Sequence, residues 1–227
     1  MYNAFCFLMQ LLILSVALLG SFLLGESGVV AFLALQLICA NILVLKLVVL
    51  FGIEVTTCDA YAIFAMIAVN LLREFYGPDS ALRSMLISLF LGLMVCLLLF
   101  VHNHWLPSFN DQMHGAYQIL LDPVTRVFEV SLVVSLITWF IDYSLFSYLT
   151  NIYHSMALST RMTASILISQ ALDTFLFTLW ALGPWIVDFW SIFLWSYSVK
   201  VLTVIFVVPF VTRLLGLISP RISVLWS

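Results

Sequence analysis

The chain has 227 residues, of which 64% are hydrophobic and only 8% are charged, and its formal net charge is −3. A mean hydropathy of +1.19 excludes a soluble globular domain, because too few polar side chains are available to cover one. The slightly acidic balance also argues against a nucleic-acid surface. We therefore expect a lipid bilayer around the chain and one integral membrane domain over residues 1–227.

Seven apolar segments come near the length that one membrane crossing needs, which is about 20 residues for a hydrocarbon core roughly 30 Å thick. They span residues 4–24, 29–51, 57–76, 81–101, 126–149, 160–182 and 188–212. The chain is therefore predicted to be an all-α, polytopic transmembrane helix bundle with about seven (six to seven) spans. The first segment has no basic stretch before it, so we interpret it as an uncleaved span. Only one connection, over residues 102–125, is predicted to be long.

The third segment is the least apolar of the seven, because polar and charged side chains interrupt it. These are Asp59, Asn70, Arg73 and Glu74. Six spans with one re-entrant piece are therefore the alternative to seven. Asp59 is expected close to the external boundary, where water can solvate it. The polar turn before Pro78 fits an ordinary helix stop or, alternatively, an inner gate.

Basic residues near the ends of the segments set the predicted orientation. In a seven-span path, five of them fall on one side: Arg73, Arg83, Arg161, Arg213 and Arg221. Arg126 is a single boundary cation on the opposite side. The chain is therefore predicted to be a multi-pass protein of the cell inner (cytoplasmic) membrane with a cytoplasmic C-terminus.

An internal echo links the fifth and sixth segments. Residues 135–146 align without gaps on residues 166–177, and each stretch places an Asp four residues after a small hydroxyl residue and four before a Phe. Each trio therefore shares one helical face. The trios are Thr138, Asp142 and Phe146, and Ser169, Asp173 and Phe177. Because the two segments run antiparallel, the echo is consistent with an inverted repeat, a ground plan common in transporters.

Ionisable and amide side chains also lie deep in the last two segments. Gln170 and Asp173 share one face of the sixth segment, and Lys200 follows Tyr197 by three residues in the seventh. A charged side chain at the bilayer centre costs roughly 2.5–3.5 kcal/mol, so it usually faces a partner, a cavity or a substrate. We predict substrate binding for Gln170 and Asp173. For Lys200, an ion pair with Asp173 or Asp142 is the structural alternative to a pair that opens when substrate arrives.

The second segment carries two further polar residues. Lys46 lies near its predicted external end, where the side chain can extend to the membrane interface. Asn41 is one turn deeper, within reach of a cavity shared with the later segments.

Catalytic motifs are absent from the sequence. No nucleophile elbow, phosphate loop or zinc-binding helix motif occurs, so we predict no enzymatic activity and no cofactor. Three histidines in the 102–125 connection lack the spacing of a metal site, so no metal is expected either.

Four short motifs occur in an order and spacing that resemble a known family. They are Asn41–Lys46 (NILVLK), Glu74–Gly77 (EFYG), Ser169–Thr174 (SQALDT) and Tyr197–Lys200 (YSVK) with Pro209. Arg126, Asp142 and Arg161 also match residues that the family carries. Over about residues 36–212 the chain resembles the queuosine precursor transporters, also called the vitamin uptake transporter family. It departs from their pattern at Asn70, where Asp is usual, and at Trp139, where Gln is common.

This resemblance implies uptake of a queuosine precursor, either a 7-deazaguanine base or queuine, across the cytoplasmic membrane. It also implies a bundle similar to the substrate-binding subunits of energy-coupling-factor vitamin importers. The expected substrate-binding residues are Asn41, Lys46, Asn70, Glu74, Asp142, Gln170, Asp173, Tyr197 and Lys200. Arg73, Arg126 and Arg161 are expected to be gating or structural.

The residue types suit a guanine-like base. Such a base presents a ring N–H beside an exocyclic amine, and one carboxylate, from Asp173 or Glu74, can accept both hydrogen bonds. An aromatic face can stack on the ring, and Tyr197, Trp180 or Phe177 is a candidate for that role.

Two other functions are left open at this point. One is a substrate-binding subunit that works only with an ATP-driven vitamin importer module. The other is a membrane-embedded structural or assembly protein, in which intramembrane charges only fix helix pairing. The expected partners are a small purine-like base and the lipid bilayer, with no nucleic acid. A homo-oligomer or an energising subunit is a further partner that the sequence leaves open, as it does the energy source and the preferred base.

Overall fold

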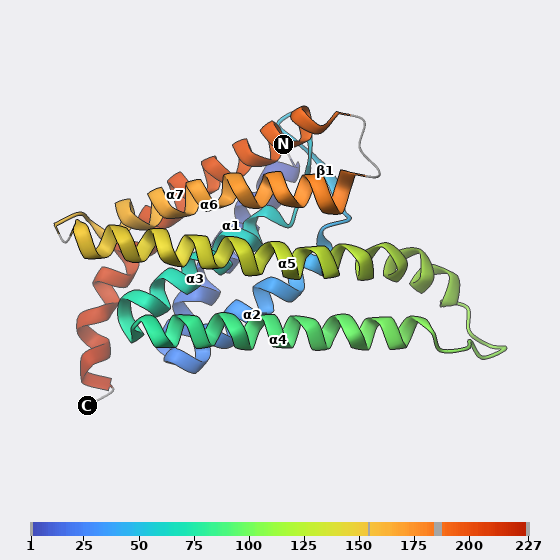
Figure 1. The fold of residues 1–227 in the computed structure, drawn as a ribbon, viewed down its shortest axis with the longest axis horizontal. Coiled ribbons are helices and arrows are strands. Elements are labelled where there is room, and N and C mark those ends of the chain that lie inside the picture. Colours follow the sequence, from blue (N-terminus) through green and yellow to red (C-terminus); the bar gives the residue numbers. More distant parts are fainter. Residues whose placement is uncertain (1, 154, 184–187, 226–227) are drawn as a thin grey trace.

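The computed structural model describes the backbone of residues 2–153, 155–183 and 188–225, and the side chains of these residues as far as Leu217. Arg221, used above for orientation, therefore has no described side chain. The described residues form seven α-helices, one β-hairpin and one π-helical turn (Figure 1). These are α1 (Tyr2–Leu23), α2 (Glu26–Leu43), β1 (Leu47–Leu50), β2 (Ile53–Thr56), α3 (Asp59–Tyr76), α4 (Pro78–Asn103), α5 (His114–Ile152), α6 (Leu158–Phe177), η1 (Thr178–Leu182) and α7 (Phe189–Leu225). The predicted all-α bundle is confirmed.

Six of the described helices are long and apolar enough to cross a membrane: α1, α2, α4, α5, α6 continued by η1, and α7. The chain is therefore a multi-pass membrane protein. The remaining helix, α3, has 18 residues, which rise about 27 Å. It carries three charged residues, Asp59 in its first turn and Arg73 with Glu74 near its end, and is therefore not among these six.

Helix α3 is the centre of the bundle, because it contacts each of the other six helices. Its residues 63–72 are all buried, and all but one of them are apolar. A helix that is apolar on every side is expected in the interior rather than on one face of a bundle. Small residues such as Ala65 and Ala68 let neighbouring helices approach α3 closely.

The β-hairpin replaces the end of the predicted second span. The helix stops at Leu43, and β1 and β2 then pair antiparallel from Leu47 opposite Thr56 to Leu50 opposite Ile53. Phe51 and Gly52 form the turn with φ values of 54° and 86°, as the commonest two-residue hairpin turns require. The predicted helical span to residue 51 is therefore wrong over its last residues, where β-branched valines favour a strand. We call the end of the bundle that carries these strands the hairpin end.

The predicted long connection over residues 102–125 is also wrong. Helix α4 continues to Asn103 and α5 begins at His114, so only ten residues separate the two helices. Helix α5 has 39 residues, and its first turns bend away from the rest of the helix (Figure 1). Pro123 lies in this region and lacks the N–H that would complete the helical hydrogen bonds, which favours a bend.

The turn between α1 and α2 brings two backbones into close contact. A Cβ atom added to Gly28 would overlap the carbonyl oxygen of Ser21 and the Cβ of Leu24. Neither neighbour is the free end of a flexible side chain, so the turn requires glycine. A Cβ atom added to Gly20, one helical turn before Leu24, would meet no other atom within 4 Å.

We therefore expect Gly28→Ala to lower the free energy of unfolding by about 1–3 kcal/mol, the usual cost of overpacking. Gly20→Ala is the matched control and should leave stability unchanged or raise it by up to about 1 kcal/mol. Thermal unfolding of the two purified variants in detergent would measure the difference. Equal melting temperatures for both variants would contradict the close approach at Gly28.

Candidate functional site

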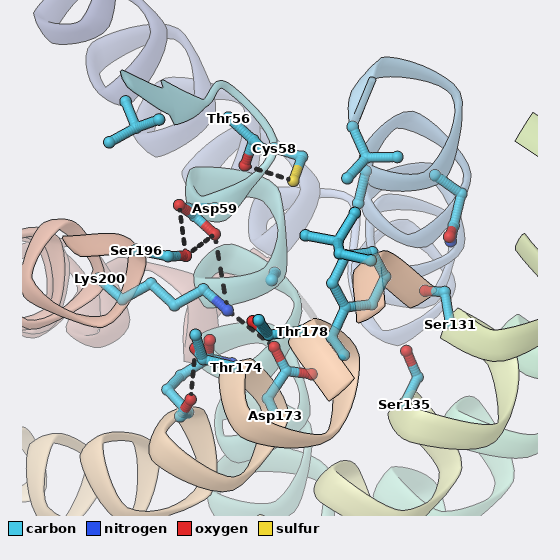
Figure 2. A pocket seen from close by; sticks show the side chains of 18 of the residues that line it. Thr56, Cys58, Asp59, Ser131, Ser135, Asp173, Thr174, Thr178, Ser196 and Lys200 are labelled. Carbon is cyan, nitrogen blue, oxygen red and sulfur yellow. Dashed lines mark hydrogen bonds and ion pairs between the residues drawn. The ribbon is translucent and has the colours of Figure 1, made fainter. Parts of the chain in front are cut away.

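A cavity of about 410 Å³ lies inside the hairpin end of the bundle (Figure 2). Side chains from α2, α3, α5, α6, η1 and α7 and from both strands line it. The substrate-binding residues expected from the sequence came from the second, third, fifth, sixth and seventh segments, and the hairpin is an additional wall of the cavity. Glu54 of β2 is exposed and borders the cavity, so the hairpin lies at its opening.

The charged part of the cavity is a three-residue ion cluster. Lys200 Nζ lies 2.8 Å from Asp173 Oδ2 and 3.6 Å from Asp59 Oδ1. The Ser196 hydroxyl, one turn before Lys200 on α7, lies 3.2 Å and 3.1 Å from the two Asp59 oxygens. Figure 2 shows the Lys200 side chain reaching between the two aspartates. The cluster joins α3, α6 and α7, and two carboxylates facing one ammonium leave it a formal excess of one negative charge.

Asp59 is the main departure from the sequence-based interpretation. It was expected to be solvated at the boundary, but only 5% of its surface is exposed. The reason is that the N-terminal half of α7 packs beside the start of α3 and covers it. Of the two ion pairs considered for Lys200 from the sequence, the pair with Asp173 is present. No pair with Asp142 occurs among the described residues.

Two glutamine side chains give the cavity unused hydrogen-bonding capacity. The Oε1 atoms of Gln36 on α2 and Gln170 on α6 are buried and have no hydrogen-bond partner among the described residues. The Nε2 of Gln170 lies 3.0 Å from the Sδ of Met66, and a thioether is only a weak acceptor. Buried polar atoms without partners are uncommon, and both residues line the cavity, so a small rotation of either side chain would let its oxygen accept an N–H group from a ligand.

The remaining walls are mostly apolar. Trp139 of α5 and Phe177 of α6 both line the cavity, and Trp139 occupies the position equivalent to Gln170 in the internal echo. Tyr197 does not line the cavity, because its hydroxyl donates to the Leu167 carbonyl at 3.2 Å. Trp180 is 43% exposed and also lies outside the lining. Of the aromatic residues considered from the sequence, only Phe177 borders the space.

A second polar cluster lies at the opposite end of the bundle. Arg161 of α6 makes a two-point contact with Glu74 of α3, at 2.8 Å and 3.2 Å, and donates to the Thr150 hydroxyl at 2.7 Å. The guanidinium of Arg73 donates to Ser147 at 2.6 Å. These contacts join α3 to the start of α6 and to the end of α5.

Both guanidinium groups of this cluster also stack on one aromatic ring. The Cζ atoms of Arg73 and Arg161 lie 5.7 Å and 5.5 Å from the centroid of Phe146, within the range of cation–π attraction. Phe146 is fully buried. Phe146 and Phe177 hold equivalent positions in the internal echo. Phe146 lies against the two arginines of this cluster, whereas Phe177 lines the cavity.

The structure thus divides the predicted site residues into two groups. Asn41, Gln170, Asp173 and Lys200 line the cavity. The others lie outside its lining: Lys46, Asn70, Glu74, Asp142 and Tyr197. Lys46 is exposed just after α2, and Arg126 is exposed on α5. Asp59, Ser196, Gln36 and Trp139 line the cavity but were not predicted.

A sequence signal was available for only some of the missed residues. Ser196 lies four residues before Lys200 and therefore shares its helical face. Asp59 and Lys200 are 141 positions apart in the sequence, so only the packing of α7 against α3 reveals their contact.

Comparison with known proteins places these features in context. A family described as "Putative vitamin uptake transporter" matches residues 60–214. A protein of Bacillus subtilis (strain 168) named "Probable queuosine precursor transporter" is 31% identical over 183 residues, which cover 78% of this chain and 78% of that protein. No solved structure matches the chain.

The ion cluster generates a stability prediction. We expect Lys200→Met to lower the free energy of unfolding by about 3 kcal/mol or more, because two buried carboxylates lose their shared cation. For a chain of this size the melting temperature should fall by roughly 6–12 °C. Lys46→Met is the control: it removes an exposed cation and should change the melting temperature by less than about 2 °C. If Lys200→Met and the unmodified chain melt at the same temperature in detergent, the cluster does not hold α3, α6 and α7 together.

Proposed function

Since the chain belongs to the vitamin uptake transporter family, a family of transporters and not of enzymes, we propose that it imports a queuosine precursor. The substrate would be a 7-deazaguanine base or queuine, taken up across the cytoplasmic membrane. The 31% identity with the Bacillus subtilis relative supports this choice of substrate class. The proposal rests above all on the cavity, which Asp173 and Lys200 line together with Gln36 and Gln170, whose Oε1 atoms have no hydrogen-bond partner among the described residues.

The polar groups of the cavity match the edges of a guanine-like ring. Among the described residues Asp173 Oδ1 has only the distant Thr138 hydroxyl, at 3.5 Å, so it is available to accept a ring N–H or an exocyclic amine. The free oxygens of Gln36 and Gln170 accept further N–H groups of the base. Lys200 and the amide of Asn41 offer donors to a carbonyl or a ring nitrogen. A base without the matching edge would leave these buried groups unpaired, which is the usual source of strong discrimination.

The size and walls of the cavity also suit a flat heterocycle. Its volume of about 410 Å³ lies within the range of small-molecule sites, roughly 300–1,000 Å³. Stacking of a base on an aromatic side chain contributes about 1–3 kcal/mol, and Trp139 or Phe177 would supply that face.

Transport would proceed by alternating access around this site. The cavity borders the hairpin end, whereas the arginine cluster closes the opposite end. Arg73, Arg83 and Arg161 lie on the helix ends of that closed side, which supports a cytoplasmic orientation for it and for the C-terminus. In this arrangement the cavity would be the outward-facing site, with the substrate held beside Lys200, about a third of the way along α7.

Substitution in the cavity tests the proposal directly. We expect Asp173→Asn to reduce uptake of radiolabelled queuine by about 10–100-fold below saturation, because a charge-assisted hydrogen bond contributes roughly 1.5–3 kcal/mol. Asp79→Asn is a matched control, since Asp79 is exposed at the start of α4 on the other side of the bundle.

Purified protein in liposomes is the appropriate system for this measurement. Uptake without any ATPase module would favour a self-sufficient transporter, whereas uptake only after such a module is added would favour the importer-subunit alternative. If Asp173→Asn takes up queuine at the unmodified rate, the cavity is not the substrate site.

The arginine cluster is proposed to act as the inner gate. Arg161→Glu and Glu74→Arg should each lower uptake by about tenfold, because each leaves two like charges in contact. Combining the two restores opposite charges, so uptake should recover to within about threefold of the unmodified chain. Arg83→Glu, at an exposed arginine on the same side, is the control and should have little effect. Failure of the double exchange to recover any activity would argue against a gate built on this pair.

A further inference from the structure

The internal echo has a reciprocal geometry in the folded chain. Thr138 Oγ1 of α5 lies 3.5 Å from Asp173 Oδ1 of α6, and Ser169 Oγ of α6 lies 3.3 Å from Asp142 Oδ1 of α5. Each helix therefore places its hydroxyl against the aspartate of the other. The two aspartates hold equivalent positions, and Ser169 precedes Asp173 by four residues, so the two contacts lie about 6 Å apart along α6.

The surroundings of the two aspartates nevertheless differ. Asp173 faces the cavity and is paired with Lys200. Asp142 is fully buried away from the cavity lining, and no described cation lies within 4 Å of it. An uncompensated buried carboxylate is strongly unfavourable, which makes the neutral acid the more compatible form at this position.

The hydroxyl and amide donors around Asp142 are shared with other acceptors. Asp142 Oδ2 is buried and has no partner among the described residues, and the same holds for Oδ1 of Asn70 on α3. The hydroxyl proton of Ser169 has a nearer acceptor in the Ser165 carbonyl, at 2.9 Å. Ser165 in turn donates to the Met162 carbonyl at 3.2 Å, while the Asn70 amide donates to Ser165 Oγ at 3.3 Å. An ionised carboxylate can only accept, whereas a protonated one supplies the missing donor.

The charged side chains on the neighbouring helices are already engaged. On α3, Arg73 donates to Ser147 and Glu74 pairs with Arg161. On α6, Arg161 lies eight residues before Ser169, about 12 Å along the helix. The only other carboxyl nearby on α6 is Asp173, which holds Lys200. The groups that face the Asp142 carboxyl directly are the neutral side chains of Asn70, Ser165 and Ser169.

We propose that Asp142 is a proton-carrying site and that the proton it exchanges with the cavity couples uptake of the base to the proton gradient. This inference rests on the proposed function and assigns its energy source. One proton would bind to the Asp142 carboxyl from the outward-facing cavity, by way of the contacts around Thr138 and Ser169. The same proton would leave toward the other side when the arginine cluster opens.

The test uses the full chain in liposomes that contain a pH-sensitive dye. Three quantities are measured: exchange of labelled for unlabelled queuine without a gradient, accumulation of queuine driven by an imposed pH gradient, and acidification of the lumen when queuine is added outside. The unmodified chain should show all three. Asp142→Asn should lower gradient-driven accumulation and acidification by at least about tenfold, while exchange falls by less than about threefold.

Two further variants separate coupling from structural effects. Asp142→Glu keeps a titratable carboxyl and should recover part of the accumulation. Asp79→Asn should behave like the unmodified chain. Gradient-driven accumulation by Asp142→Asn at the unmodified level would overturn the proposal.

The unmodified chain decides the matter even if Asp142→Asn does not fold. If it exchanges queuine but neither acidifies the lumen nor responds to the gradient, proton coupling is excluded while queuine transport stands. If it shows no exchange of queuine at all, the proposed function fails and the coupling proposal fails with it.

Discussion

The contact of Lys200 with Asp173 and Asp59 is the constraint on which the rest of the arrangement depends. Each charge lies in a mostly apolar helix and would be costly if it faced lipid. Pairing resolves this cost only if α3, α6 and α7 meet at one height, with the start of α3 beside the N-terminal half of α7. That requirement fixes the position of three helices at once. It also leaves polar groups gathered around a space that apolar packing alone would have filled.

The sequence identified the helices well where length and composition were decisive, and poorly where an apolar run changes its local structure. Residues 44–51 are as apolar as the helix before them, so hydropathy alone could not separate a strand from a continuing span. The same limit applies to the start of α5, where polar residues indicated a connection but the chain is already helical. Helix α3 was the converse case, because its neighbours bury it although it carries three charged residues.

The site was predictable as a set of residue types but not as a geometry. Asn41, Gln170, Asp173 and Lys200 were identified because polar groups are rare and costly in such segments. Asp142 and Asp173 each follow a small hydroxyl residue by four positions and precede a Phe by four, yet only Asp173 meets a lysine. The difference comes from the neighbouring helices, because Lys200 of α7 reaches Asp173 whereas the neutral Asn70 of α3 faces Asp142. No local pattern carries that information.

The hairpin gives the entrance of the cavity a mechanical property that the helices do not share. An isolated two-stranded sheet is only marginally stable by itself. Two side-chain hydrogen bonds from α1 connect its strands and the following loop to the bundle, from Asn3 to the Val49 carbonyl at 2.8 Å and from Gln10 to the Thr57 carbonyl at 3.0 Å. Releasing both would cost about 1–3 kcal/mol and would disturb no helix–helix packing. The hairpin at the opening of the cavity can therefore move to admit a larger substrate while the helices keep their packing.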